Sequence, residues 1–194
     1  EGYYCISGAL NNTGAVGILG GDSGLCPSGH YCETGAAFPI PCSPGTFSPN
    51  EGNRLESSCE PCSPGKYCPY PGQSEAVLDC REGYYCLTGS TNESPTDNIS
   101  GNVCPKGHYC PRGSPEPILC SQGTYTDMQG QNSCVSCPRG FYCHNGTITP
   151  TACPPGHFCP EGTGYNIPQC PPGTFTNETM RESAQECTLC SGGF

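Results

Sequence analysis

Cysteine is the residue whose type and spacing could carry chemistry in this chain. The 194 residues include 20 cysteines. The spacing Cys-x-x-Cys, which zinc sites and redox dithiols share, occurs at residues 59/62, 134/137 and 187/190. His30, His108 and His157 each stand at the same distance from a cysteine, which adds a second type of zinc ligand. Zinc binding, thiol redox chemistry and structural disulfides are therefore the three alternatives.

A repeated motif, Cys-x-x-Gly-x-(Tyr/Phe), positions these cysteines. Its complete copies begin at Cys26, Cys42, Cys62, Cys80, Cys104, Cys120, Cys137, Cys153 and Cys170. The glycine permits a positive φ or a close chain crossing, the aromatic supplies apolar area and the cysteine supplies a crosslink. The histidine position holds Lys66, Tyr84 or Phe141 in other copies, and nearly every cysteine has a mate at a repeated spacing. The pattern therefore favours structural disulfides, with no metal and no other cofactor.

The repeat is hierarchical. Cutting at each leading cysteine gives residues 26–41, 42–61, 62–79, 80–103, 104–119, 120–136, 137–152, 153–169 and 170–189. These repeats group into blocks 1–79, 80–152 and 153–194, because the order of long, short and Gly-Thr repeats returns after 78 residues, from Cys26 to Cys104. The motif copies at both chain ends are truncated, so we expect a piece of a longer chain, built as a quasi-one-dimensional array.

Composition excludes a single large core. The chain has 28 Gly and 22 Pro, no Trp and 34% hydrophobic residues, which is typical of a disulfide scaffold. The predicted fold is a tandem of small disulfide-rich repeats, an elongated rod of short β-hairpins and turns with little regular secondary structure. We expect β ladders of two or three residues at residues 46–47 and 125–126, and one helical turn within 180–186.

Two pairings of the cysteines satisfy the repeat. The first closes each repeat on itself: Cys26–Cys32, Cys42–Cys59, Cys62–Cys68, Cys80–Cys86, Cys104–Cys110, Cys120–Cys134, Cys137–Cys143, Cys153–Cys159 and Cys170–Cys187. It leaves Cys5 and Cys190 to partners outside the chain. The second joins neighbouring repeats: Cys5–Cys26, Cys32–Cys42, Cys59–Cys68, Cys62–Cys80, Cys86–Cys104, Cys110–Cys120, Cys134–Cys143, Cys137–Cys153 and Cys159–Cys170. We adopt the first as the prediction and keep the second open.

The cysteine content predicts an oxidising compartment, hence an extracellular or cell-surface protein of the secretory pathway. The net charge is −10 with only seven Lys and Arg, which argues against nucleic acid or an anionic membrane as a partner. No run of about 20 apolar residues is present that would span a bilayer. The acidity is interpreted as solubility of an extended surface, because no acidic loop has the spacing of a calcium site.

The motif carries a family resemblance. Residues 42–67 and 170–190 combine Cys-x-Pro-Gly-Thr-Phe with Cys-x-x-Cys, and this combination resembles the ephrin-receptor-like cysteine-rich repeats and, more distantly, tumour-necrosis-factor-receptor modules. The Tyr-Cys repeats are similar to tandem arrays of large extracellular proteins of protists and invertebrates. The resemblance implies an extracellular, disulfide-laddered rod without catalysis.

Five sequons of the type Asn-x-Ser/Thr predict N-linked sugar: Asn11, Asn92, Asn98, Asn145 and Asn177. Pro95 follows the serine of the Asn92 sequon and weakens that site. Secreted, loop-rich chains expose such asparagines. Residues 147–151 could also carry O-linked glycans.

No catalytic triad, phosphate loop or carboxylate pair stands out, so the sequence predicts a protein that is not an enzyme. The favoured function is a structural glycoprotein, the repeat rod of an extracellular filament, stalk or coat that associates with itself or with other extracellular chains. The alternative is a ligand-binding or adhesive ectodomain of a cell-surface receptor. It is less favoured because the motif uses most of the aromatic residues and leaves only Phe38, Tyr70 and Tyr165 for an interface.

Overall fold

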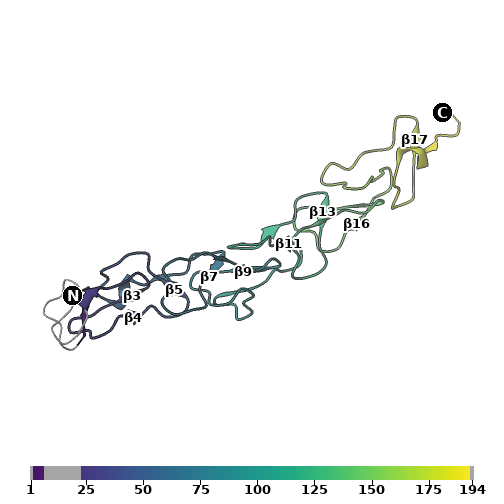
Figure 1. The fold of residues 1–194 in the computed structure, drawn as a ribbon. Coiled ribbons are helices and arrows are strands. Elements are labelled where there is room, and N and C mark those ends of the chain that lie inside the picture. The colour runs from purple at the N-terminus through teal and green to yellow at the C-terminus, as the bar shows by residue number, and fades with distance from the viewer. Residues whose placement is uncertain (1, 7–22, 193–194) are drawn as a thin grey trace. The chain divides into compact units, whose positions relative to one another are not determined.

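The computed structural model describes residues 2–6 and 23–192, and within them the regular structure consists of small hairpins and two 3₁₀ turns. The hairpins pair β1 (Tyr3–Cys5) with β2 (Ser23–Leu25), β3 (His30–Tyr31) with β4 (Ile40–Pro41), β5 (Thr46–Phe47) with β6 (Glu60–Pro61), β7 (Lys66–Tyr67) with β8 (Leu78–Asp79), β9 (Tyr84–Cys86) with β10 (Gly101–Val103), β11 (His108–Tyr109) with β12 (Ile118–Leu119), β13 (Thr124–Tyr125) with β14 (Val135–Ser136), β15 (Phe141–Tyr142) with β16 (Thr151–Ala152), and β17 (Thr174–Phe175) with β18 (Thr188–Leu189). The 3₁₀ turns are η1 (Glu56–Ser58) and η2 (Ala184–Glu186). Figure 1 shows these short strands joined by long irregular loops, with no layer of sheet or helix.

Each hairpin follows from one motif. The first strand contains the motif aromatic, and the second strand directly precedes the next leading cysteine, as in β11 and β12, where His108 lies opposite Leu119. The repeat 153–169 has a single bridge between His157 and Gln169 in place of strands. The prediction of disulfide-rich hairpin repeats without a single core is confirmed.

Two local expectations differ in detail from the structure. The ladder at residues 46–47 is β5, whereas the second ladder is Thr124–Tyr125, one residue earlier than expected. Thr126 leaves the ladder because its N–H donates to the carbonyl oxygen of Thr147 in the next repeat. The expected helical turn within 180–186 is the short 3₁₀ turn η2 at its end.

The chain divides into two parts. The first contains Glu1–Asn102 and Arg112–Glu116, and the second contains Val103–Pro111 and Pro117–Phe194. Both parts are built from the same hairpin repeat.

Nine disulfides crosslink the described residues. They join Cys26–Cys32, Cys42–Cys59, Cys62–Cys68, Cys80–Cys86, Cys104–Cys110, Cys120–Cys134, Cys137–Cys143, Cys153–Cys159 and Cys170–Cys187. These pairs are those of the first alternative, which closes each repeat on itself. Cys5 and Cys190 are exposed and unpaired in the part of the chain that the structure describes.

Half-cystines form the buried interior of the repeats. In the disulfides whose cysteines are six positions apart, such as Cys104–Cys110, neither cysteine is exposed to solvent. The motif aromatics lie at the edge of this interior: Tyr67 and Tyr109 are half-buried, and Phe175 is exposed. Sulfur pairs, more than aromatic rings, therefore replace the hydrophobic core that a repeat of this size cannot build.

The Gly-Thr repeats place a hydroxyl where the other repeats have their second cysteine. Ser48, Thr126 and Thr176 stand six positions after a leading cysteine, and all three are buried. Their hydroxyl groups are hydrogen-bonded, as in Asn53 Nδ2 donating to Ser48 Oγ at 2.8 Å. The second cysteine of these repeats, for example Cys59, closes a longer loop instead.

Backbone hydrogen bonds join each repeat to the next. In eight copies of the motif, the N–H of the glycine donates to the carbonyl oxygen six positions after the next leading cysteine. These bonds are Gly2 to Cys32, Gly29 to Ser48, Gly45 to Cys68, Gly65 to Cys86, Gly107 to Thr126, Gly123 to Cys143, Gly140 to Cys159 and Gly156 to Thr176. The carbonyl oxygen of the leading cysteine in turn accepts an N–H from the next repeat, as Cys120 does from Gly146 at 2.8 Å. The repeats are therefore joined to one another by main-chain hydrogen bonds.

The motif glycine also approaches the repeat after next. A Cβ atom built on Gly123 would lie 2.4 Å from the carbonyl oxygen of Gly162, a distance that no real Cβ contact allows. The same approach to a carbonyl oxygen occurs at Gly2, Gly29, Gly45, Gly65, Gly107 and Gly140. The residue approached by Gly140 is Met180, which has a positive φ of 62° where the other repeats have glycine. Glycine is thus required at the motif position by contact as well as by conformation.

We predict that Gly123→Ala destabilises the second part more than Gly156→Ala does. Both glycines occupy the motif position with φ near +80°, but a Cβ on Gly156 meets nothing within 4 Å. Positive φ alone costs alanine about 1–2 kcal/mol, and overpacking against the Gly162 carbonyl adds roughly 1–3 kcal/mol. Denaturant unfolding of both variants under non-reducing conditions measures the difference. Equal losses in the two variants would show that the close approach is unimportant.

We predict that tryptic digestion without reduction distinguishes the two pairings. Cleavage after Arg54 and Lys66 separates residues 1–54 from residues 55–66. The Cys42–Cys59 disulfide keeps these two peptides linked, whereas the alternative pairing confines all bridges of residues 1–54 to that peptide. Mass spectrometry should find the linked species and should lose it after reduction. Release of a bridged 1–54 peptide alone would contradict the pairing.

Candidate functional site

The cysteines beside the repeated histidines are engaged in disulfides and so offer no thiolate to zinc. Cys26–Cys32, Cys104–Cys110 and Cys153–Cys159 enclose His30, His108 and His157. Each of these histidines donates from Nδ1 to the carbonyl oxygen two residues earlier, at 3.0–3.1 Å. Among the described residues no group of three or more His, Cys, Asp and Glu side chains is arranged to hold a metal ion. The repeated histidine is thus part of the motif turn.

The sequons at Asn92 and Asn98 lie in the long loop between β9 and β10, and both asparagines are exposed. Asp97 organises this loop: its Oδ1 accepts the N–H groups of Ile99 and Ser100 at 2.8 Å, and its Oδ2 accepts the Ser100 hydroxyl. These hydrogen bonds lower the pKa of Asp97. Asn98 has a positive φ of 60°, and its Oδ1 accepts a hydrogen bond from Asn102.

Asn145 and Asn177 are also exposed, while Asn11 lies outside the described residues. Asn177 follows the buried Thr176 at the end of β17. Asn145 follows β15, and its Oδ1 accepts the N–H of Gln122 from an earlier repeat at 2.8 Å. All four described sequons therefore present their asparagine to solvent, as N-glycosylation requires. Glycosylation itself stays a prediction.

A surface pocket of about 420 Å³ lies against Asn145, lined by Gln122, His144, Asn145 and Tyr165. The His144 ring lies 5.5 Å from the Tyr165 ring and 5.2 Å from the Tyr142 ring. Tyr165 was recognisable in the sequence as an aromatic outside the motif. The sequence does not show that Tyr165 lies beside Gln122 and His144, because the three residues belong to three successive repeats.

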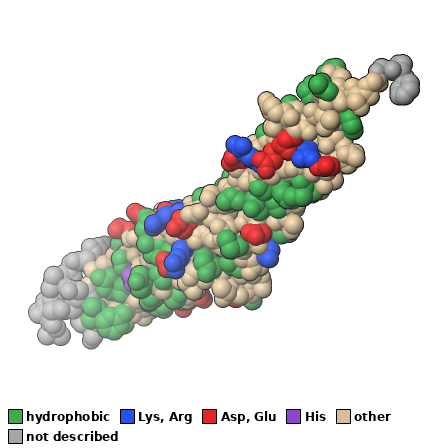
Figure 2. Space-filling view, turned by 90° about the vertical axis from the view of Figure 1, so that its right-hand side faces the viewer, with side chains coloured by type: hydrophobic (Ala, Val, Ile, Leu, Met, Phe, Trp, Pro, Cys, Tyr) green, Lys and Arg blue, Asp and Glu red, His purple; other side chains and the backbone are tan. Residues whose placement is uncertain are grey.

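A charged cluster lies on the first part around Asp79. Cross-strand pairing of β7 and β8 places Lys66 opposite Asp79, and Lys66 Nζ lies 2.9 Å from Asp79 Oδ1. Arg112 Nε lies 3.6 Å from Asp79 Oδ2. The hydrogen bond and charge of Lys66, aided by Arg112, lower the pKa of Asp79. On the face drawn in Figure 2, Lys and Arg side chains likewise lie beside Asp or Glu side chains, so these charges are interpreted as surface ion pairs.

A second cluster surrounds Arg181 next to η2. Arg181 pairs with Glu178 and with Glu186, the latter at 3.2 Å. Glu186 closes a capping box with Ser183. Burial opposes the charge of Glu186, but hydrogen bonds from the Glu182 N–H, Arg181 and Ser183 outweigh it and lower the pKa of this carboxyl.

We predict that Asp79→Asn removes stability in a pH-dependent way. Because the folded pKa of Asp79 is lowered from 3.8, its contribution is complete above that value and is lost as pH falls through the folded pKa. The difference in unfolding free energy between the native chain and Asp79→Asn should therefore be larger at pH 6 than at pH 2. Asp127→Asn, at an exposed position, is the control and should show no such dependence on pH. A difference that grew on acidification would contradict the ion-pair assignment.

Within the described segments, no helix has the length and apolar character needed to cross a membrane. The nine disulfides indicate a protein of an oxidising environment, extracellular or secreted.

Comparison with known proteins gives two partial similarities. No family model matches the chain. Over 102 residues, 49% of this chain, it is 29% identical to ABC transporter G family member 28 of Arabidopsis thaliana, of which the match covers 9%. Over 49 residues, 25% of this chain, it is 39% identical to the ABC-type transporter claG of Penicillium crustosum, of which the match covers 5%. The chain is thus similar to small portions of two much longer proteins.

Proposed function

We propose that this chain belongs to a structural extracellular glycoprotein, in which the tandem repeats form the spacer of a filament, stalk or coat. The observation that supports this role best is the main-chain interface repeated between successive repeats, from the Gly2–Cys32 hydrogen bond to the Gly156–Thr176 hydrogen bond. An interface made of main-chain hydrogen bonds can be repeated from one motif copy to the next along a chain. A rod without catalysis is the function that such a construction serves.

The surface of the repeats supports the same role. The net charge of −10 repels lateral neighbours, so close bundling would need glycans, divalent ions or a second chain to screen it. Exposed sequons at Asn98, Asn145 and Asn177 would carry sugars that hydrate a chain with little core. The partners of this proposal are further copies of the chain or other extracellular chains.

The two partial similarities fit a modular element. They cover 9% and 5% of two transporters, so a segment of this kind occurs as a small portion of longer, different proteins. The similarity does not carry transport to this chain, because the matches cover only these small portions of the transporters.

A ligand-binding or adhesive ectodomain at the cell surface is the second candidate. The observation that favours it is the exposure of Phe38, Tyr70 and Tyr165, which are 66%, 66% and 73% exposed. Exposed aromatics of this kind are the common anchors of protein interfaces.

We predict that the chain scatters X-rays as an extended particle. A compact globule of this length would have a radius of gyration of about 16 Å, and a tandem of repeats that contact only near neighbours should exceed it clearly. Electron micrographs of the native material should then show filaments or stalks. A compact radius would contradict the extended tandem of repeats. A monomer that binds one soluble ligand with saturable 1:1 stoichiometry would favour the receptor candidate instead.

A further inference from the structure

The pocket beside Asn145 combines aromatic rings with amide groups. It is lined by the rings of His144 and Tyr165 and by the amide side chains of Gln122 and Asn145. An adjoining depression of about 260 Å³ shares Gln122 and Tyr165 and adds Asn166. Aromatic faces that contact the apolar side of a pyranose, together with amides that bind hydroxyl and acetamido groups, are the usual chemistry of sugar recognition.

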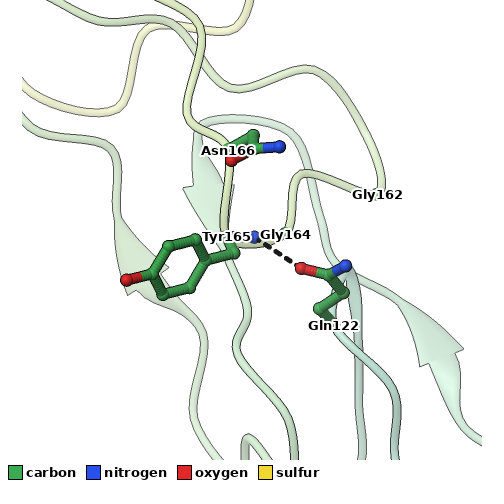
Figure 3. Close-up of a pocket in the computed structure, with 5 residues that line it drawn as sticks. All are labelled: Gln122, Gly162, Gly164, Tyr165 and Asn166. Atoms are coloured by element: carbon green, nitrogen blue, oxygen red, sulfur yellow. Dashed lines mark hydrogen bonds between the residues drawn. The ribbon is translucent and has the colours of Figure 1, made fainter.

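Hydrogen bonds across repeats fix this arrangement. The N–H of Gln122 donates to Asn145 Oδ1 at 2.8 Å, and the N–H of Tyr165 donates to Gln122 Oε1 at 3.2 Å. Figure 3 shows the second bond and the Tyr165 ring extending away from the Gln122 side chain. The backbone of Tyr165 is thereby tied to the Gln122 side chain, while 73% of the residue stays exposed. An exposed aromatic ring whose backbone is anchored in this way is available to stack on a partner.

The asparagine of the pocket is also a sequon asparagine. Asn145 is followed by Gly146 and Thr147, and its Oδ1 is occupied by the Gln122 N–H. The atom that would carry a glycan is the other amide atom, Nδ2. A sugar on this nitrogen would start inside the lining of the pocket.

We infer that the pocket is the seat of the first two N-acetylglucosamine residues of a glycan on Asn145, stacked on Tyr165 and His144. This inference rests on the proposed glycoprotein function and specifies one of its sites. Attachment gives the sugar a high effective concentration at the pocket, so a shallow, exposed surface that would bind a free saccharide weakly suffices. Asn177, by comparison, lines none of the pockets described here.

The test measures how well the inner sugars are protected. The disulfide-intact chain is expressed in a eukaryotic secretory host, and release of glycan by peptide-N-glycosidase F is followed at Asn145 and Asn177 by mass spectrometry. Release at Asn145 should be slower than at Asn177. Tyr165→Ala should accelerate release at Asn145 roughly two- to tenfold, the range expected for loss of one aromatic contact, and leave Asn177 unchanged.

Tyr70→Ala is the matched control, because Tyr70 is exposed to a similar extent but does not line the pocket. His144→Ala is a second variant and should act like Tyr165→Ala. Equal release at both sites in the native chain, or no acceleration in either pocket variant, would overturn the seat while leaving the glycoprotein role intact. Absence of sugar at Asn145 with sugar present at Asn98 and Asn177 would also overturn it, whereas absence of sugar at all sites would count against the glycoprotein itself.

Discussion

The main-chain contact between successive repeats is the constraint on which the rest of this structure depends. A repeat of this size cannot bury enough apolar surface to fold alone, and the backbone groups near its cystine would be left unpaired. The motif glycine contributes to both. Its N–H donates a hydrogen bond to the next repeat at 2.7–3.2 Å, and because it has no side chain, a carbonyl oxygen of the repeat after next can approach it closely. Burial of sulfur and pairing of amides are therefore achieved together.

This constraint explains why two kinds of repeat can alternate. In the short kind, the sixth position after the leading cysteine is a half-cystine, and in the Gly-Thr kind it is Ser48, Thr126 or Thr176. All are small and buried, and in both kinds the carbonyl oxygen at this position accepts the bond from the preceding glycine. The crosslink can thus move to a longer loop, as in Cys42–Cys59, without a change in the interface.

The parts of the fold that the sequence predicts are those encoded within one repeat. Spacing identifies the hairpin and two candidate pairings, but cannot choose between the pairings, because each places cysteines at reasonable distances along the chain. The turn at the motif glycine decides, since it brings the α-carbons of Cys104 and Cys110 to 5.8 Å. Contacts between a repeat and the repeat after next leave no comparable pattern in the spacing of the sequence. The approach of Gly123 to Gly162 and the pocket between Gln122 and Tyr165 therefore emerge only in three dimensions.

Each repeat contacts mainly the next two repeats, and this limits how far local unfolding spreads along the chain. Opening of one hairpin removes hydrogen bonds from its neighbours and from few other residues, so stability within each part is local, as in other repeat proteins. The pocket beside Asn145 spans that same distance, because Gln122, Asn145 and Tyr165 stand in three successive repeats. A sugar seated there would contact all three and would resist their separation. Glycosylation would in this way act on the array as a crosslink does, at a point where no disulfide joins one repeat to another.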